Sequence, residues 1–299
     1  MTILWTILVG LGLWLVANLL ATIGLALAYR SWTNTVDWTA DGLMPSAQPL
    51  AEGTGETALL FVHGFNDVPF VWTRFVTELA VRGFHCRALR VPGAGERNCH
   101  PSLDAMRAQL DAELHALKNT YRRVVLIGHS MGGALTLDAT LRRTDVRPDG
   151  LFLLAPLVEV SRKRSPVLSA YAYFRIARTL FPRLRWIPSV FKEYLHAEDD
   201  PTFVYRRDRF NEIHWYVALF QLVSILRHAD KSRLALPICV FTGGNDRVVD
   251  STATARWFAD VPTATVHDCP EKAHVLPLLS GWRHLVDDLE AFAKGISRR

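Results

Sequence analysis

Metal-binding and redox motifs are missing from this sequence of 299 residues. Its four cysteines form no C-x-x-C pair, which argues against a zinc site and against thioredoxin-like chemistry. Long runs of lysine or arginine are also missing, so the net charge of +5 does not indicate nucleic-acid binding. That charge fits a basic face resting on anionic lipid instead. We expect neither a metal ion nor an organic cofactor.

Charge is absent from residues 3–29, ILWTILVGLGLWLVANLLATIGLALAY. At about 1.5 Å per residue, a helix over this run spans a hydrocarbon core of about 30 Å with room for tilt. Trp5 and Tyr29 lie near its two ends, where interfacial aromatic residues belong. We expect residues 1–30 to form an N-terminal transmembrane anchor, which makes this a single-pass membrane protein.

The alternative for this segment is a cleaved secretory signal peptide, because residues 26–28, Ala-Leu-Ala, resemble an A-x-A cleavage site. Two features argue against cleavage. No lysine or arginine precedes the apolar run, and the run is longer than the roughly 7–15 apolar residues of a signal peptide. Arg30 is the first charge after the run and favours a catalytic domain on the cytoplasmic side.

Residues 124–133, VVLIGHSMGG, combine a strand, a sharp turn and the start of a helix. The apolar run before Gly128 predicts a strand buried on both faces, and a helical pattern begins after Gly132. A bare G-x-S-x-G also arises by chance, but this context is typical of the nucleophile elbow. We therefore predict Ser130 as a catalytic nucleophile. The N–H of Met131, at a helix N-terminus, is a predicted oxyanion donor.

Strands alternate with helices along most of the chain after a linker at residues 31–56, in which we expect one short edge strand. This alternation predicts an α/β fold with a mostly parallel, doubly wound sheet and helices on both faces. Apolar runs predict strands at residues 57–62, 84–89, 124–128, 150–155, 236–242 and 263–267. Helical patterns predict helices at residues 69–81, 102–119, 252–259 and 279–294, besides the helix after Gly132.

The alternation breaks at residues 157–232, which are rich in arginine and aromatic side chains. We expect a helical lid insertion here, which leaves residues 57–156 and 233–299 as the core of the fold. The aromatic side chains either pack the insertion against that core or line an apolar pocket for a substrate.

A serine hydroxyl needs a base within hydrogen-bond reach, usually a histidine that a carboxylate orients. In the fold that uses this elbow, the chain order is serine, acid, histidine. Asp246 follows the next-to-last predicted strand and His274 follows the last one, so both reach the sheet edge where Ser130 lies. We predict Asp246 as the acid and His274 as the base. For Asp246 the alternative is an ordinary turn aspartate.

The loop after the strand at residues 57–62 is expected to supply the second oxyanion donor. His63-Gly64-Phe65 lies there, and the N–H of Phe65 is the candidate. We expect His63 to order this loop by hydrogen bonding. His129, although adjacent to Ser130, is expected to point elsewhere.

From about residue 57 to residue 294, the chain resembles the α/β-hydrolase superfamily, in its monoglyceride lipase and lysophospholipase-like esterase branch. Four motifs in order carry the resemblance: HGF at 63–65, GHSMGG at 128–133, GGNDRVV at 243–249 and AHVLP at 273–277. The chain departs from the family at Asn66, where many members have glycine, and in the short segment before residue 57.

The resemblance implies an eight-stranded fold with a lid inserted after the sixth strand. It also implies ester hydrolysis by a serine triad without a cofactor. By position, it assigns the triad to Ser130, Asp246 and His274, and the oxyanion donors to Phe65 and Met131.

We therefore expect a membrane-anchored serine hydrolase that cleaves carboxylic esters through an acyl-enzyme. The expected substrates are lipid-like esters such as monoacylglycerols or lysophospholipids. An acyltransferase would use the same triad with an alcohol in place of water, and an amidase or peptidase shares the tetrahedral chemistry. A non-catalytic hydrolase-fold binding module is the third alternative, although such modules typically lose a triad member and all three are present here.

Overall fold

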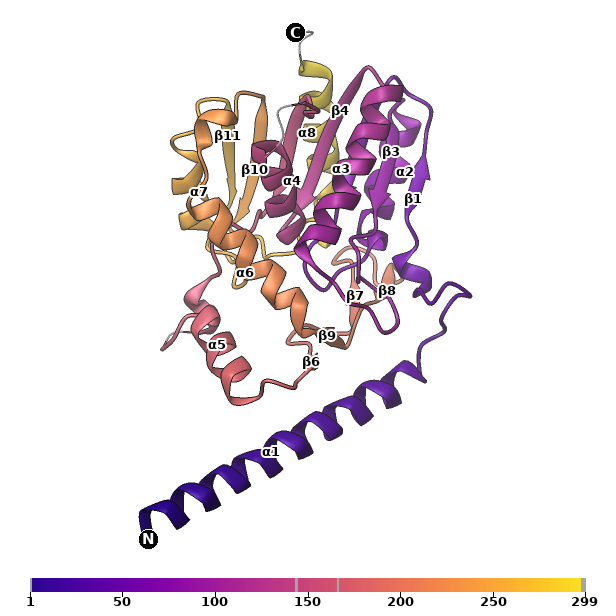
Figure 1. Cartoon of the computed structure of the whole chain (residues 1–299). Coiled ribbons are helices and arrows are strands. Elements are labelled where there is room, and N and C mark those ends of the chain that lie inside the picture. Colours follow the sequence, from indigo (N-terminus) through magenta and orange to yellow (C-terminus); the bar gives the residue numbers. More distant parts are fainter. Residues whose placement is uncertain (1, 143–144, 166, 297–299) are drawn as a thin grey trace.

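The computed structural model describes residues 2–142, 145–165 and 167–296 and shows a long N-terminal helix below a layered α/β domain (Figure 1). The central sheet has the strand order β1-β3-β2-β4-β5-β10-β11. Its strands are β1 (Leu50–Glu52), β2 (Thr57–Val62), β3 (His85–Leu89), β4 (Arg123–His129), β5 (Gly150–Leu154), β10 (Ile238–Gly243) and β11 (Ala264–Cys269). Every neighbouring pair is parallel except β1 with β3. The predicted mostly parallel α/β sheet is confirmed.

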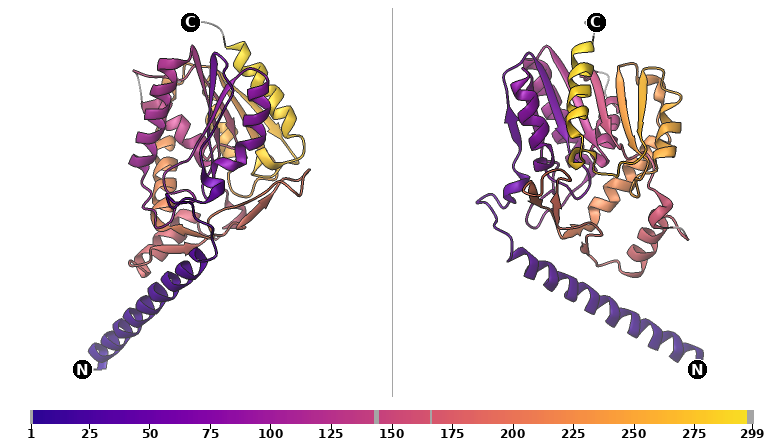
Figure 2. Two further views of the ribbon diagram at one scale, coloured as in Figure 1. Left: turned by 90° about the vertical axis from the view of Figure 1, so that its right-hand side faces the viewer. Right: turned by 180° about the vertical axis from the view of Figure 1, so that it is seen from behind.

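Helices cover both faces of this sheet, as Figure 2 shows from the side and from behind. On one face lie α2 (Thr73–Val81) and α8 (Trp282–Gly295), and on the other lie α3 (Leu103–Thr120), α4 (Met131–Arg142) and α7 (Ser251–Phe258). The strands β2, β5 and β10 are buried at every residue, which explains why they are apolar throughout rather than alternating. The Ser102 side chain caps α3 by accepting a hydrogen bond from the Ala105 N–H at 3.1 Å.

The central sheet has seven strands in the described residues, one fewer than the resemblance implied. The short chain before β2 explains the difference. It supplies the one expected edge strand, β1, and otherwise forms a 3₁₀ turn at Pro45–Ala47. Residues 31–56 are also more than a linker, because Trp32, Met44 and Ala47 are buried in the hydrophobic core.

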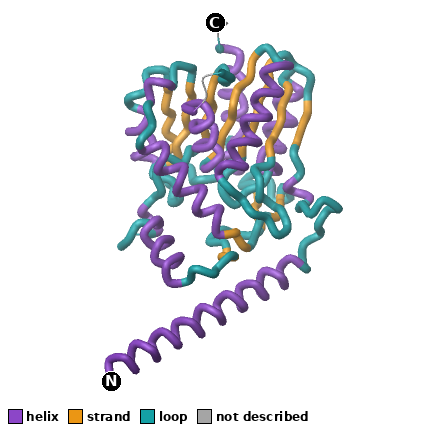
Figure 3. Tube along the Cα trace, viewed as in Figure 1, coloured by secondary structure: helices purple, strands orange, loops and turns teal. Residues whose placement is uncertain are grey.

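The chain between β5 and β10 was predicted to be a helical insertion, and that prediction is wrong in part. Two helices are present, α5 (Ala170–Leu180) and α6 (Ile213–Arg227). Between them lies an antiparallel ribbon, seen as the small strands in Figure 3, in which β6 (Trp186–Pro188) pairs with β9 (Phe210–Glu212) and β7 (Tyr194–His196) with β8 (Val204–Arg206). Strands of three residues are too short for the alternation that identifies a strand in a sequence.

The N-terminal helix α1 (Thr2–Thr33) is the one helix of the described chain long and apolar enough to cross a membrane. It projects along the lower edge of the domain with most of its side chains exposed (Figures 1 and 2). Its last turn docks on the ribbon, where Tyr29 stacks on Trp186 with ring centroids 3.5 Å apart. Trp32 donates a hydrogen bond to Glu193 at 2.9 Å. The helix is therefore attached to the insertion.

Asp138 is a buried carboxylate on α4, the helix that carries the predicted nucleophile at its start. Its side chain is 1% exposed and accepts hydrogen bonds from Arg107 of α3 at 2.7 and 2.8 Å. Arg142 donates a third at 3.1 Å. These bonds tie α3 to α4 and satisfy a charge that would otherwise be costly to bury.

We predict that Asp138→Asn lowers the free energy of unfolding by roughly 2–4 kcal/mol, because Arg107 and Arg142 both lose their buried charged partner. The control is Asp104→Asn, since Asp104 lies 3.8 Å from the same Arg107 but is 95% exposed. Its effect should stay below about 0.5 kcal/mol. Urea titration of the detergent-solubilised protein measures both, and equal effects would contradict the prediction.

Candidate active site

Ser130 occupies a strained turn between β4 and α4. Its φ of 53° lies in the left-handed region, which costs energy for a residue with a Cβ. The turn is held by bonds to β5 and its exit loop: the Ser130 N–H donates to the Leu154 carbonyl at 3.0 Å, and the Leu157 N–H donates to the Ser130 carbonyl at 2.9 Å. A Cβ on Gly132 would lie 2.2 Å from the Val62 carbonyl oxygen, so only glycine fits there. This geometry matches the predicted elbow.

The structure brings the three predicted triad residues together. Ser130 Oγ lies 2.9 Å from His274 Nε2, and His274 Nδ1 lies 2.7 Å from Asp246 Oδ2. The other oxygen of Asp246 accepts hydrogen bonds from the N–H groups of Val248 and Val249 at 2.7 and 2.9 Å. These two bonds fix the carboxylate, so Asp246 is more than the ordinary turn aspartate that the sequence left open.

The surroundings of Asp246 favour the charged form of its carboxylate. Burial by itself raises the pKa of Asp246, but the hydrogen bond and charge interaction with His274, together with hydrogen bonds from Val249 and Val248, outweigh burial and leave that pKa below 3.8. The carboxylate therefore accepts a hydrogen bond from Nδ1–H of His274. Nε2 then carries a lone pair that accepts the hydroxyl proton of Ser130.

Two hydrogen-bonded loops bring the acid and the base to the same place. The loop after β10 carries Asp246 and the loop after β11 carries His274. The Gly244 N–H donates to the Cys269 carbonyl at 3.0 Å and the Asn245 N–H donates to the Lys272 carbonyl at 3.1 Å. Parallel neighbouring strands end at the same edge, so these loops meet beside the elbow.

Two buried histidines support the site without belonging to the triad. His63 accepts a hydrogen bond from the Val91 N–H at 3.0 Å and its other nitrogen contacts the Gly64 carbonyl at 3.0 Å, so it orders the loop after β2. The Nε2 atom of His129 lies 3.0 Å from the His274 carbonyl, so this ring contacts the main chain of the predicted base. Sequence reasoning missed the contact of His129 with the His274 carbonyl, because no spacing in the sequence indicates it.

The predicted oxyanion loop lies against the nucleophile, since a Cβ on Gly64 would be 3.1 Å from Ser130 Cβ. Asn66 adopts a φ of 52°, the left-handed conformation that glycine favours and asparagine tolerates. Its side chain also donates to Ser189 Oγ at 2.9 Å. The departure from the family at Asn66 therefore keeps a glycine-like backbone and adds a contact to the insertion.

The insertion covers the site in this conformation. The Phe65 ring lies between Trp215 and Tyr216 of α6, with centroid distances of 5.8 and 5.0 Å. The space beside Gly64, Met131 and Trp215 does not admit a water molecule. Ser130 is only 4% exposed. A substrate therefore reaches Ser130 only if α6 or its aromatic side chains move.

Comparison with known proteins identifies the family. The profile of the family described as Serine aminopeptidase, S33 (Hydrolase_4) matches residues 54–278. This chain belongs to the S33 family. This chain is 21% identical to phospholipase YtpA of Bacillus subtilis (strain 168) over 211 residues. The aligned region covers 68% of this chain and 81% of YtpA.

Solved structures share the fold of this S33 chain. One from the metagenome-derived lipolytic enzymes LipS and LipT has a TM-score of 0.69 at 17% identity, over 84% of this chain and 99% of that one. A soluble variant of monoglyceride lipase from Saccharomyces cerevisiae has a TM-score of 0.67 at 14% identity, over 88% and 99%. The resemblance to α/β-hydrolases of the lipase branch is confirmed. Family and relatives support an ester hydrolase of the lipase or esterase type.

The buried His129 should make the stability of this S33 protein depend on pH. Burial lowers its pKa from 6.5 to about 3, so the unfolded chain takes up a proton more readily than the folded one. The stability that the neutral ring contributes is complete above about pH 6.5 and is lost as the pH falls toward the folded pKa.

We predict that His129→Gln, whose amide can still donate to the His274 carbonyl, reduces the stability loss between pH 7 and pH 5 by about 2 kcal/mol. Urea titrations at the two pH values measure this difference. His284→Gln serves as the control, because that histidine is exposed on α8. An unchanged pH slope in His129→Gln would show that His129 is not buried in its neutral form.

Proposed function

We propose that this protein is a membrane-anchored serine hydrolase that cleaves carboxylic esters with lipid-like acyl chains, such as monoacylglycerols or lysophospholipids. The observation that carries the proposal is the hydrogen-bonded chain from Ser130 through His274 to the buried Asp246. It lies at the carboxyl edge of a parallel sheet, where α/β proteins bind ligands.

The proposed reaction begins when Ser130 Oγ attacks the ester carbonyl carbon while His274 Nε2 takes the hydroxyl proton. Asp246 stabilises the imidazolium that forms. The N–H groups of Met131 and Phe65 hold the oxyanion of the tetrahedral intermediate. His274 then protonates the leaving alcohol and the carbon–oxygen bond breaks. Water repeats the sequence on the acyl-enzyme, which releases a carboxylic acid and free Ser130.

Three observations support a lipid-like substrate. The apolar helix α1 docks on the insertion that covers Ser130. Aromatic rings of that insertion, Phe191, Trp215 and Tyr216, surround the oxyanion loop at Phe65. The relatives named above are called a phospholipase and a monoglyceride lipase.

The contacts of α1 support an uncleaved anchor rather than a signal peptide. Trp14 and Asn18 donate hydrogen bonds to the Leu180 carbonyl at the end of α5, at 2.9 and 2.8 Å. Cleavage after residues 26–28 would remove both donors. We propose that the catalytic domain lies on the cytoplasmic side, for which Arg30 is the supporting charge.

We predict that a fluorophosphonate probe labels the detergent-solubilised protein, and that Ser130→Ala and His274→Ala each lose the labelling. Activity on a soluble short-chain ester should fall by about 10³-fold or more in each variant, because the nucleophile and its base act as one unit. Ser232→Ala is the matched control, since Ser232 is an exposed serine whose side chain donates a hydrogen bond to Asp230, away from the triad. Folded wild-type protein that stays unlabelled even with lipid micelles would favour a non-catalytic module.

An ester series graded from acetyl to long acyl chains then tests the substrate class, with an aminoacyl anilide included because of the family's description. We expect kcat/KM at matched solubility to rise beyond octanoyl. Faster turnover of acetyl esters would overturn the lipid preference, and faster turnover of the anilide would overturn ester hydrolysis in favour of a peptidase.

The anchor predicts that intact mass of the mature protein, purified by a C-terminal tag from membranes, includes residues 2–28. It also predicts that the protein stays in the membrane pellet after carbonate extraction, since a transmembrane helix is held by its buried apolar surface. A mature chain that begins at Tyr29 would establish the signal peptide instead.

A further inference from the structure

The helix α5 exposes its aliphatic side chains and directs its arginines toward the protein, which is the reverse of a helix on the surface of a water-soluble protein. Its outer stripe is apolar, and Tyr173, Ile176 and Leu180 on it are 46%, 48% and 47% exposed. Its arginines, Arg175 and Arg178, lie on the side toward α6. No residue of α5 is buried. In water an amphipathic helix places its apolar stripe against the protein, so this orientation indicates a non-aqueous surrounding for the outer stripe.

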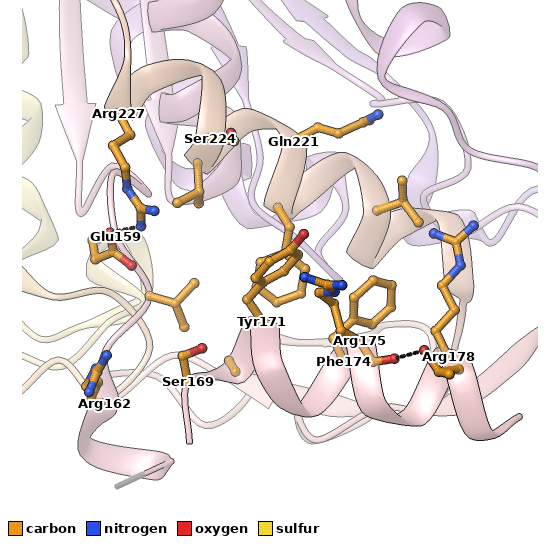
Figure 4. Close-up of a pocket in the computed structure, with 16 residues that line it drawn as sticks. Glu159, Arg162, Ser169, Tyr171, Phe174, Arg175, Arg178, Gln221, Ser224 and Arg227 are labelled. Atoms are coloured by element: carbon orange, nitrogen blue, oxygen red, sulfur yellow. Dashed lines mark hydrogen bonds and ion pairs between the residues drawn. The ribbon is translucent and has the colours of Figure 1, made fainter. Parts of the chain in front are cut away.

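A pocket of about 770 Å³ separates α5 from α6 (Figure 4). Aromatic rings form its apolar part, with Tyr171 and Phe174 of α5 facing Phe220 of α6 at centroid distances of 5.2 and 5.3 Å. None of the predicted triad or oxyanion residues lines it. It is therefore a separate cavity from the space around Ser130.

Positive charge dominates the polar part of this pocket. Four arginines and one glutamate line it: Arg162, Arg175, Arg178, Arg227 and Glu159. Glu159 is bound to Arg227 at 2.7 Å, as the dashed line in Figure 4 marks. In the described part of the chain, no carboxylate forms an ion pair with Arg162, Arg175 or Arg178. Three guanidinium groups therefore remain for a ligand beside an aromatic wall.

We propose that this pocket binds a membrane lipid with an anionic headgroup. Guanidinium groups bind phosphate and carboxylate through paired, charge-assisted hydrogen bonds, and the aromatic wall suits the start of an acyl chain. The volume lies in the range of ordinary small-molecule sites, roughly 300–1,000 Å³. Arg162, Arg175 and Arg178 line the pocket and stay exposed, so their guanidinium groups are accessible to a headgroup from the surrounding lipid.

The bilayer is the source of the ligand, because α5 lies beside α1. The Leu180 carbonyl accepts hydrogen bonds from Trp14 and Asn18, near the middle of α1. If α1 lies in the bilayer, this contact brings the end of α5 and its outer stripe beside membrane lipid. This inference rests on the proposed anchor but not on the proposed hydrolysis, and it goes beyond both.

The test measures binding of an acyl-labelled lysophosphatidic acid to the full-length Ser130→Ala protein in a neutral detergent, so that turnover cannot consume the probe. Arg175→Gln combined with Arg178→Gln should weaken binding by about tenfold or more, because two charge-assisted contacts are lost. The control pair, Arg183→Gln with Arg209→Gln, removes the same charge from exposed positions outside the pocket. It should change binding by no more than about twofold.

Two further measurements separate the alternatives. Ser224→Trp fills the pocket without removing charge and should also weaken binding, which keeps the proposal testable if the arginine variant fails to fold by circular dichroism. Monooleoylglycerol should compete poorly, and inorganic phosphate should not compete at the same concentration. Equal losses of binding in the two arginine double variants would show that general surface charge, and not the pocket, attracts the lipid, which would overturn the proposal. Unchanged binding in the pocket variants, or full competition by inorganic phosphate, would overturn the lipid site.

Discussion

The hydrogen bonds that join Asp246, His274 and Ser130 depend on the ends of three strands lying in register. Ser130 follows β4, and the acid and the base follow β10 and β11, with β5 between β4 and β10. Any slip of one strand would move its loop by a residue spacing of about 3.3 Å, which is larger than the tolerance of a hydrogen bond. The apolar packing of both sheet faces therefore does more than stabilise the domain. It holds three distant segments within the 2.7 to 2.9 Å that the site requires.

The backbone is strained at two positions in and beside the predicted triad. Ser130 and Asn66 both adopt left-handed φ values, and the two loops lie in contact. Main-chain hydrogen bonds to Leu154 and Leu157 hold the turn at Ser130. His63 and the bond from Asn66 to Ser189 hold the loop at Asn66. His63 and His129 both stay neutral because burial lowers their pKa values to about 4 and about 3. Neutral rings at these positions add no positive charge beside the base.

The insertion connects the site to the N-terminal helix. Its ribbon receives the last turn of α1, its helix α6 places Trp215 beside Gly64 and Met131, and its helix α5 contacts the middle of α1. If α1 is the anchor that we propose, the cover of the site lies beside the membrane surface. The exposed apolar stripe of α5 is consistent with that proposal, because a helix beside a membrane segment would have lipid on one side and protein on the other.

The sequence by itself determined the elements whose signals are local. The elbow follows from Gly128, Ser130 and Gly132 in a strand–turn–helix context, and the apolar runs located each strand of the core to within a few residues. Asp246 and His274 were identified because chain order and strand ends restrict where they can lie. Long, strongly patterned segments carry this information in their own residues.

Only the tertiary structure decided the ribbon of the insertion, the contact of His129 with the His274 main chain, and the orientation of α5. Each depends on residues far apart in sequence: β6 pairs with β9 across more than twenty residues, and Leu180 meets Trp14 across 166 positions. The periodicity of a sequence does not show which segment a three-residue strand pairs with. It also does not show which neighbour a helix with aromatic and basic residues on one side packs against. The partner is chosen by burial and hydrogen bonding in three dimensions, and that choice determines which side of α5 faces α6 and which side is left exposed beside α1.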